Sequence, residues 1–173
     1  QSNKIQQKKH QGFTLIELIV TLMVLAISVS IPYQVFYLDK KQSIDSATRT
    51  LTSAFQLARS EAVSRQTVIT VNNDGNWGDG LSIYTDDNPA GNTAFSAIND
   101  TLIKDLDYSM DGITTNSNDN GNFISFTSTG LLNEGGNQRL IAICDDRGAD
   151  EGTLITLSIV GRTTISNTNT CAP

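Results

Sequence analysis

The 173-residue sequence has one histidine, His10, and only two cysteines. No histidine follows His10, so the chain beyond it has no Ser/His or Cys/His pair for nucleophilic catalysis, and histidine-based metal ligation is excluded there. A glycine-rich phosphate loop of the P-loop type is also missing. We therefore expect a protein without enzymatic activity and without a cofactor.

Carboxylates are the remaining candidates for site chemistry. The pairs Asp86-Asp87 and Asp145-Asp146 are adjacent in sequence, which is typical of solvated turns. Two groups could supply calcium ligands by number alone: Asp145-Asp146 with Asp150 and Glu151, and Asp74 with Asp79. Neither follows the EF-hand spacing, so we expect acidic loops and no metal site.

Basic residues are scarce beyond the first 40 positions. From Asp39 onward there are 17 acidic and 9 basic residues, a net charge of −8. Such a surface keeps a domain soluble and disfavours a nucleic-acid or anionic-lipid partner. Beyond Lys104 the basic residues are Arg139, Arg147 and Arg162, whereas binding a polyanion needs several phosphate contacts at once.

One long apolar run is present, from residue 13 to residue 31, with Glu17 as its single ionisable side chain. As a helix it spans about 28 Å, close to the hydrocarbon thickness of a bilayer. Lys4, Lys8 and Lys9 precede it without an acidic residue, which places the N-terminus in the cytoplasm. The pattern predicts a single-pass segment with the following domain on the external side.

Three other interpretations of this run fit less well. A secretory signal peptide has a shorter apolar stretch with its small residue after it, whereas Gly12 stands before it. A plain anchor leaves Glu17 unexplained, because an unpaired carboxylate there costs up to about 2.5–3.5 kcal/mol. A buried core helix explains neither the lysines nor the length.

The stretch Gly12-Phe13-Thr14-Leu15-Ile16-Glu17 resembles the class III leader of type IV prepilins and type II secretion pseudopilins. The resemblance implies that residues 1–12 are a leader removed by the prepilin peptidase between Gly12 and Phe13, and that Phe13 is then N-methylated. It also implies that Glu17 meets the terminal amine of Phe13 on a neighbouring subunit. The protein would wait in the inner membrane, with its domain in the periplasm, before joining an extracellular pilus.

Residues 32–65 predict the second half of the same helix. Pro32 removes one helix hydrogen bond and should kink the helix without ending it. Apolar residues then recur at spacings of three and four, as expected for a domain-facing surface. They are Ile44, Ala47, Leu51, Phe55, Ala58 and Ala62.

Residues 66–173 change to a period of two and predict a β-rich domain. We expect strands at residues 68–71, 81–85, 101–106, 123–127, 140–144 and 154–160, and a polar loop at 111–122. The predicted fold class is α+β: a long N-terminal helix packed on an antiparallel sheet of about five to seven strands, as in pilins. Trp77 is expected to be a half-buried aromatic over the helix, in preference to an exposed sugar-stacking residue.

Cys144 and Cys171 both follow the apolar run, on the external side, where a disulfide is the default state. It would close a loop of about 28 residues and stabilise the fold by roughly 3–4 kcal/mol. Two buried free thiols are the alternative, but Cys171 lies so close to the end of the sequence that little else would hold it down.

Four further pieces resemble the FimT/FimU/GspH group of minor pilins and H-type pseudopilins. They are Ala58-Arg59-Ser60-Glu61-Ala62, Trp77 with Gly80-Leu81, Cys144-Asp145 with Arg147-Gly148, and Gly161-Arg162. The resemblance implies a structural subunit near the pilus tip that helps to start assembly, with other pilin subunits as partners. By resemblance, a disulfide favours the pilus branch.

Two alternative functions follow from the same resemblance. One is a DNA receptor for natural transformation, as for FimT-like minor pilins with a Gly-Arg-x-Arg tail. This chain reads Gly161-Arg162-Thr163-Thr164, so Arg162 is the DNA-binding candidate and the second arginine is missing. The other alternative is the H-type pseudopilin of a type II secretion system.

Overall fold

A computed structural model describes residues 12–73, 75–87, 95–110, 112–119, 121–133, 137–145, 152–168 and 170–171, without the side chains of residues 29–40. The expected leader lies outside the described residues except for Gly12. Four of the calcium candidates, Asp74, Asp146, Asp150 and Glu151, also lie outside them. The chain divides into two units, Gln1–Asp39 and Lys40–Pro173.

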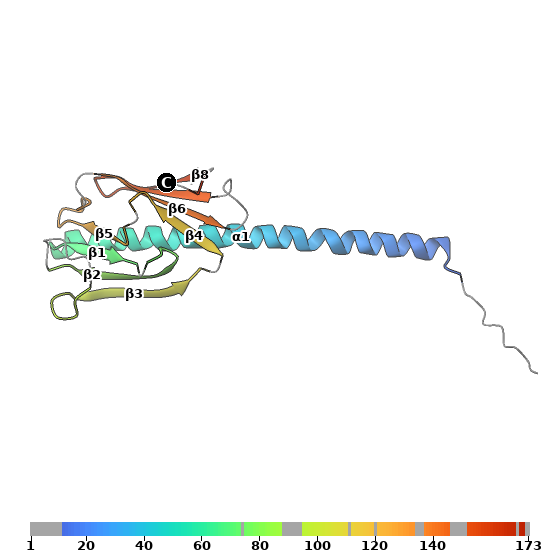
Figure 1. Ribbon diagram of the computed structural model, residues 1–173, viewed down its shortest axis with the longest axis horizontal. Helices are drawn as coiled ribbons and strands as arrows, with labels where there is room; N and C mark the ends of the chain where they lie inside the picture. Colours follow the sequence, from blue (N-terminus) through green and yellow to red (C-terminus); the bar gives the residue numbers. More distant parts are fainter. Residues whose placement is uncertain are drawn as a thin grey trace, which may run out of the picture. The chain divides into compact units, whose positions relative to one another are not determined.

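The described part contains one helix, α1 (Leu15–Arg65), which continues through Pro32 as expected (Figure 1). It begins two residues after the predicted start because Thr14 caps it. The Glu17 N–H donates to the Thr14 carbonyl oxygen at 3.1 Å and to Thr14 Oγ1 at 3.4 Å, and these bonds satisfy a donor that has no partner inside the helix.

No helix within the described residues is both long enough and apolar enough to cross a membrane. The side chains of residues 29–31, the last three of the expected span, lie outside the described part. The membrane segment therefore stays a prediction.

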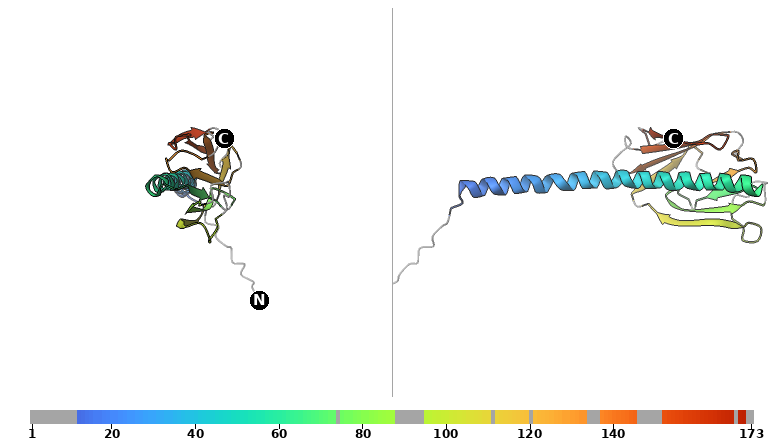
Figure 2. Two further views of the ribbon diagram at one scale, coloured as in Figure 1. Left: turned by 90° about the vertical axis from the view of Figure 1, so that its left-hand side faces the viewer. Right: turned by 180° about the vertical axis from the view of Figure 1, so that it is seen from behind.

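The C-terminal half of α1 has one buried face, and the spacing of its apolar residues predicted that face. All six predicted residues are at most 4% exposed: Ile44, Ala47, Leu51, Phe55, Ala58 and Ala62. In the left view of Figure 2 the strands lie to one side of this half of the helix. Small alanines at three of the positions allow the sheet side chains to approach the helix backbone closely.

The strands form two antiparallel sheets of four strands each. The first sheet has the order β3-β2-β1-β5 and the second the order β4-β6-β7-β8. The first contains β3 (Leu102–Ser109), β2 (Asp79–Thr85), β1 (Ile69–Asn72) and β5 (Phe123–Phe126). The second contains β4 (Ile113–Ser117), β6 (Arg139–Asp145), β7 (Gly152–Leu157) and β8 (Thr163–Thr168).

The α+β class is confirmed, but the strand count is larger than predicted and the strands are divided between two sheets. Strand β4 lies inside residues 111–122, which were expected to form a loop, and β8 lies in a tail for which no strand was expected. Both are short, polar and rich in threonine. They lack the alternation of apolar residues that marks a half-buried strand, because each has a neighbour on only one side of its sheet.

A single core joins the two sheets to the helix. Ile69 and Val71 of β1 share it with Ile141 and Ile143 of β6, and all four are fully buried. Phe55 of α1 belongs to the same cluster. The helix therefore holds both sheets by one apolar face.

Candidate functional site

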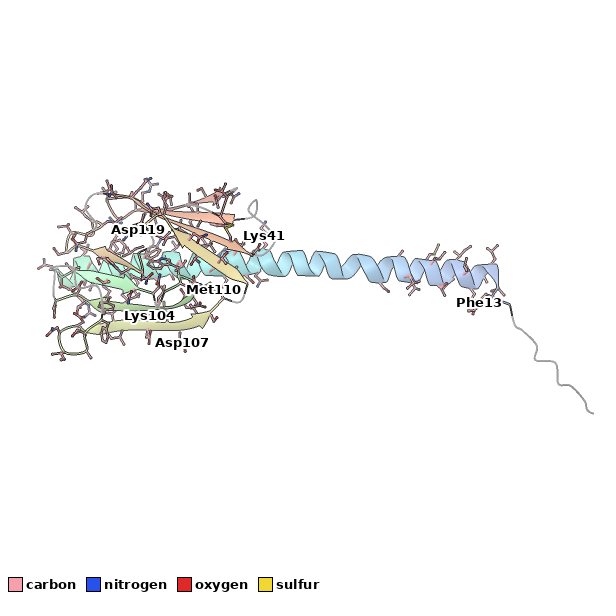
Figure 3. All side chains as sticks on the ribbon, in the orientation of Figure 1. Phe13, Lys41, Lys104, Asp107, Met110 and Asp119 are labelled. Atoms are coloured by element: carbon pink, nitrogen blue, oxygen red, sulfur yellow. A yellow bond between two sulfur atoms is a disulfide. The ribbon has the colours of Figure 1, made fainter. Side chains whose placement is uncertain are left out.

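The residues of the expected processing site come directly before α1. Gly12 and Phe13 are non-helical and exposed. Apart from Gly12 and its chain neighbours, no described residue comes within 4 Å of a Cβ placed on Gly12. The Phe13 side chain is 78% exposed (Figure 3). Both sides of the expected scissile bond are therefore accessible, and cleavage and N-methylation stay predictions.

Glu17 occupies the third helical position after the Thr14 cap, which completes the Ser/Thr-x-x-Glu pattern of a capping box. Its carboxylate also stands at the positive end of the helix dipole. Sequence reasoning assigned Glu17 to a partner subunit and did not consider this local role, although the motif was readable. Glu17 thus has two candidate roles, one within the helix and one between subunits.

The first turns of α1 present apolar side chains in every direction. Those of Leu15, Ile16, Leu18, Ile19, Val20, Leu22, Met23, Val24, Leu25 and Ile27 are at least 38% exposed. A helix that is apolar all round is stable only inside a lipid or protein environment. The single acidic side chain within this surface is Glu17.

The predicted disulfide is confirmed between Cys144 on β6 and Cys171, with their Cα atoms 5.9 Å apart. The Asn116 side-chain amide of β4 donates to the Cys171 carbonyl at 2.6 Å, which ties the tail to a second strand.

Gly152 is a residue that sequence reasoning missed. A Cβ there would lie 2.9 Å from Cys144 Sγ and 2.8 Å from the Thr168 Cγ2 methyl, so any larger residue would have to displace the disulfide or the end of β8.

Trp77 packs over the helix as predicted, but it is buried where a half-buried side chain was expected. It is 3% exposed and meets Phe55 of α1 edge to face, with ring centroids 5.5 Å apart. The Tyr108 hydroxyl donates to the Trp77 carbonyl at 3.1 Å. An indole enclosed in this way presents no open face on which a sugar could stack.

Arg59 connects α1 to two turns that are distant in sequence. Its Nε donates to the Gly130 carbonyl at 3.0 Å, across 71 residues. Gly161 has φ of 71°, and a Cβ on it would lie 2.2 Å from that same carbonyl oxygen. The two motif pieces that contain Arg59 and Gly161 therefore form one structural joint.

A groove of about 600 Å³ lies next to this joint. Its walls come from the last turns of α1 and from the start of β8. The lining residues are Gln56, Arg59, Ser60, Val63, Ser64, Gly161, Arg162 and Thr163. The structure thus brings the DNA-binding candidate Arg162 to the same groove as Arg59, a pairing that sequence spacing could not show.

The other described basic residues of the β-domain do not extend this groove into a basic patch. Arg139 is 7% exposed and forms an ion pair with Asp119, and it also donates to the Phe123 carbonyl at 3.2 Å. Burial lowers the pKa of Arg139. Lys104 lies on β3, in the other sheet (Figure 3).

Among the described residues, no group of three or more Asp, Glu, His or Cys side chains is placed so that it could hold a metal ion. Asp79, one of the calcium candidates, accepts hydrogen bonds from the Ser109 hydroxyl at 3.1 Å and the Asn76 amide at 3.3 Å. The Ser109 bond fastens the start of β2 to the end of β3, and the Asn76 bond lies within the turn before β2.

Two family patterns match the chain. Residues 47–161 match the family described as Type II transport protein GspH, and residues 7–31 match the Prokaryotic N-terminal methylation motif. The first match runs from the buried face of α1 to Gly161. No curated protein sequence matches at a significant level.

Solved structures of pilin-type proteins are similar to this chain. A crystal structure of the type IV minor pilin FimU of Pseudomonas aeruginosa aligns with 25% identity and a TM-score of 0.64, covering 76% of this chain and 97% of the crystallised chain. A second crystal form of FimU gives 26% identity, a TM-score of 0.61 and coverage of 73% and 98%. The minor pseudopilin EpsH from the Type 2 Secretion System of Vibrio cholerae gives 13% identity, a TM-score of 0.47 and coverage of 72% and 97%.

Proposed function

The chain belongs to the GspH family, which makes it a pilin-type subunit of a type IV pilus or a type II secretion system, and we propose that it serves as a minor pilin of a type IV pilus. In this proposal it is a structural subunit that enters the filament near its tip and helps to start assembly. The observation that carries the choice of the pilus is the likeness to FimU, which extends over 97% of the FimU chain in the crystal structure.

The apolar half of α1 supports a filament subunit that first resides in the inner membrane. After cleavage by the prepilin peptidase, Phe13 would carry a methylated, positively charged amine at the end of this helix. A carboxylate and an amine that are each unfavourable alone in apolar surroundings are stabilised when they form a pair. Glu17 of one subunit and the Phe13 terminus of another would then make recruitment into the filament depend on their contact.

Two other functions remain candidates within the family. The family description itself favours the H-type pseudopilin of a type II secretion system. The convergence of Arg59 and Arg162 on one groove favours a DNA receptor, whereas the net charge of −8 from Asp39 onward opposes it. Deleting the gene distinguishes the pilus role from the secretion role. Loss of surface pili with normal protein secretion would support the pilus role, and the reverse result would support the pseudopilin.

The capping role of Glu17 gives the assembly test its controls. Glu17→Gln keeps a side chain that can complete the capping box but removes the charge. Glu17→Ala removes both, and Thr14→Ala removes the cap while leaving the charge. We expect both Glu17 variants to be inserted and processed normally but depleted at least tenfold from sheared pili, with Thr14→Ala close to wild type.

The measurement is quantitative immunodetection of the protein in sheared-pilus and membrane fractions. Wild-type levels of Glu17→Gln in the pilus fraction would show that the charge is not the assembly contact. Equal loss in Thr14→Ala would assign the effect to the helix start.

A further inference from the structure

The edge strands of the two sheets differ in how they are protected. Strand β3 carries Lys104, Asp105 and Asp107 (Figure 3), and charges on an edge discourage the addition of another strand. The outer edge of β5 is occupied by residues 131–133, since the Asn133 N–H donates to the Ser125 carbonyl at 2.9 Å.

Strand β4 is covered at Thr115, whose hydroxyl donates to the Asn76 side chain of the β1–β2 turn. Strand β8 has no comparable cover among the described residues. It ends the order β4-β6-β7-β8, pairs with β7 alone, and contains neither a charged residue nor proline. Its outer backbone edge is therefore a template for one more strand.

The face of β8 that borders the groove carries one exposed apolar side chain, Ile165. Thr163 lines the groove, and Ile165, two residues further, shares its sheet face. Ile165 pairs with Ile155, which is fully buried, yet Ile165 itself is 54% exposed. Val63 on the helix wall is 51% exposed. An extended segment beside β8 would cover both side chains.

The charges of the groove indicate what kind of segment fits. Its ionisable lining residues are Arg59 and Arg162, and no acidic residue lines it, although the chain from Asp39 onward carries a net charge of −8. A segment with carboxylates would therefore be favoured electrostatically. A second copy of β8 offers none, because its sequence is Thr-Thr-Ile-Ser-Asn-Thr.

We infer that the groove between α1 and β8 receives an extended, acidic segment of a different pilin-type subunit, which adds to the second sheet as a fifth strand. Backbone hydrogen bonds to β8 supply the general affinity, as in other strand-addition complexes. Val63 and Ile165 select an apolar side chain, and the two arginines select a carboxylate. This inference rests on the proposed role as a filament subunit.

The direct test places a photo-crosslinking residue, p-benzoylphenylalanine, at position 165 of the full-length protein in cells that assemble filaments. A matched control carries it at Leu102, which is 47% exposed on the charged strand β3. After irradiation of sheared filaments, mass spectrometry identifies the linked peptide. We expect position 165 to link to an acidic segment of another pilin-type subunit, with at least tenfold lower yield at position 102.

Two substitutions test the chemistry of the groove. Ile165→Lys places a charge on the edge strand, and Arg162→Glu reverses one of the two groove charges. Because position 165 is itself changed in one variant, the photo-crosslinking residue is placed at Val63 on the helix wall of the groove for this comparison. Each substitution should reduce the crosslink from position 63 and the amount of protein in filaments at least fivefold, while the Cys144–Cys171 disulfide still forms as evidence of folding. Normal incorporation of both variants would overturn the inference.

The failure of this inference is distinguishable from the failure of the proposed function. Absence of the wild-type protein from filaments would overturn both. Normal incorporation of the wild-type protein, with position 165 linked only to a second copy, only to DNA, or to nothing, would overturn the strand-addition inference alone.

Discussion

At the scale of single residues, Gly161 shows how a turn can depend on one missing Cβ. Its φ of 71° suits glycine, and the nearest obstacle to a side chain is a backbone oxygen that cannot move aside as a side chain would. Arg59 donates to that same oxygen. The close approach of the two turns and the helix is thus possible only with glycine at this position.

We predict that Gly161→Ala destabilises the domain by more than the roughly 1–2 kcal/mol expected for a left-handed non-glycine residue. The clash with Gly130 adds to that strain, so the total should exceed about 3 kcal/mol. Gly80→Ala is the matched control, because φ there is 77° but the nearest atom would be 3.3 Å from the new Cβ. Chemical denaturation of the detergent-solubilised protein measures both, and equal losses would contradict the role of the clash.

The buried Tyr84 and the partly buried Tyr108 make the stability of the domain depend on pH in the alkaline range. Burial, with a further contribution from Asp79, raises the pKa of Tyr108 well above its usual value. Burial, with Asp86 and Asp100, raises the pKa of Tyr84 in the same direction. A raised folded-state pKa means that the stabilisation is complete below the unfolded value of about 10 and is lost as the pH rises above it.

We therefore predict a melting temperature that falls steadily above about pH 10. Tyr108→Phe should fall less steeply, because one of the two groups is removed. At neutral pH it should be less stable by about 1 kcal/mol, the net value of a hydrogen bond such as that to the Trp77 carbonyl. Melting curves between pH 7 and 11 measure both effects, and identical slopes for the two proteins would contradict the assignment.

At the scale of the elements, the disulfide attaches the segment after β8 to β6 of the second sheet. It joins residues separated by 27 positions and brings the tail to β6, while Asn116 holds the same tail from β4. A crosslink of this length is worth about 3–4 kcal/mol by restricting the unfolded chain.

We predict that Cys171→Ser lowers the free energy of unfolding by about that amount. Its local effect should be uneven, with faster hydrogen exchange in β8 and little change in β1, which lies in the other sheet. Asn116→Ala is the control for the tail contact without loss of the covalent bond. Uniform acceleration over both sheets would show that the disulfide supports the whole core.

At the scale of the whole molecule, the same chain is expected to serve as a membrane-inserted precursor and as a filament subunit. The proposed step between the two is cleavage between Gly12 and Phe13. Replacing Gly12 with leucine should leave an uncut precursor, because a branched side chain would then occupy the position before the scissile bond. Mass spectrometry of membrane-extracted protein measures the N-terminus, and a mature protein that begins at Phe13 in this variant would contradict the assignment.

Local patterns in the sequence were sufficient for several parts of the molecule. The spacing of Ile44, Leu51 and Phe55 predicts the buried helix face, because a helix brings residues three and four apart to the same side. Alternating apolar residues predict β1, β2 and β6 for the equivalent reason with a period of two. The motif from Gly12 to Glu17 is also contiguous, so it indicated the family without any tertiary information.

Only the tertiary structure decided the division into two sheets, the identity of β4 and β8 as strands, and the groove. A threonine-rich segment becomes a strand when a neighbour satisfies its backbone, and that neighbour is chosen by the packing of the whole domain. The joint of Arg59 with Gly130 spans 71 residues, a separation at which no local pattern records contact. The sequence by itself therefore determined the helix, its buried face and the family, whereas the surfaces available to partners depend on long-range packing.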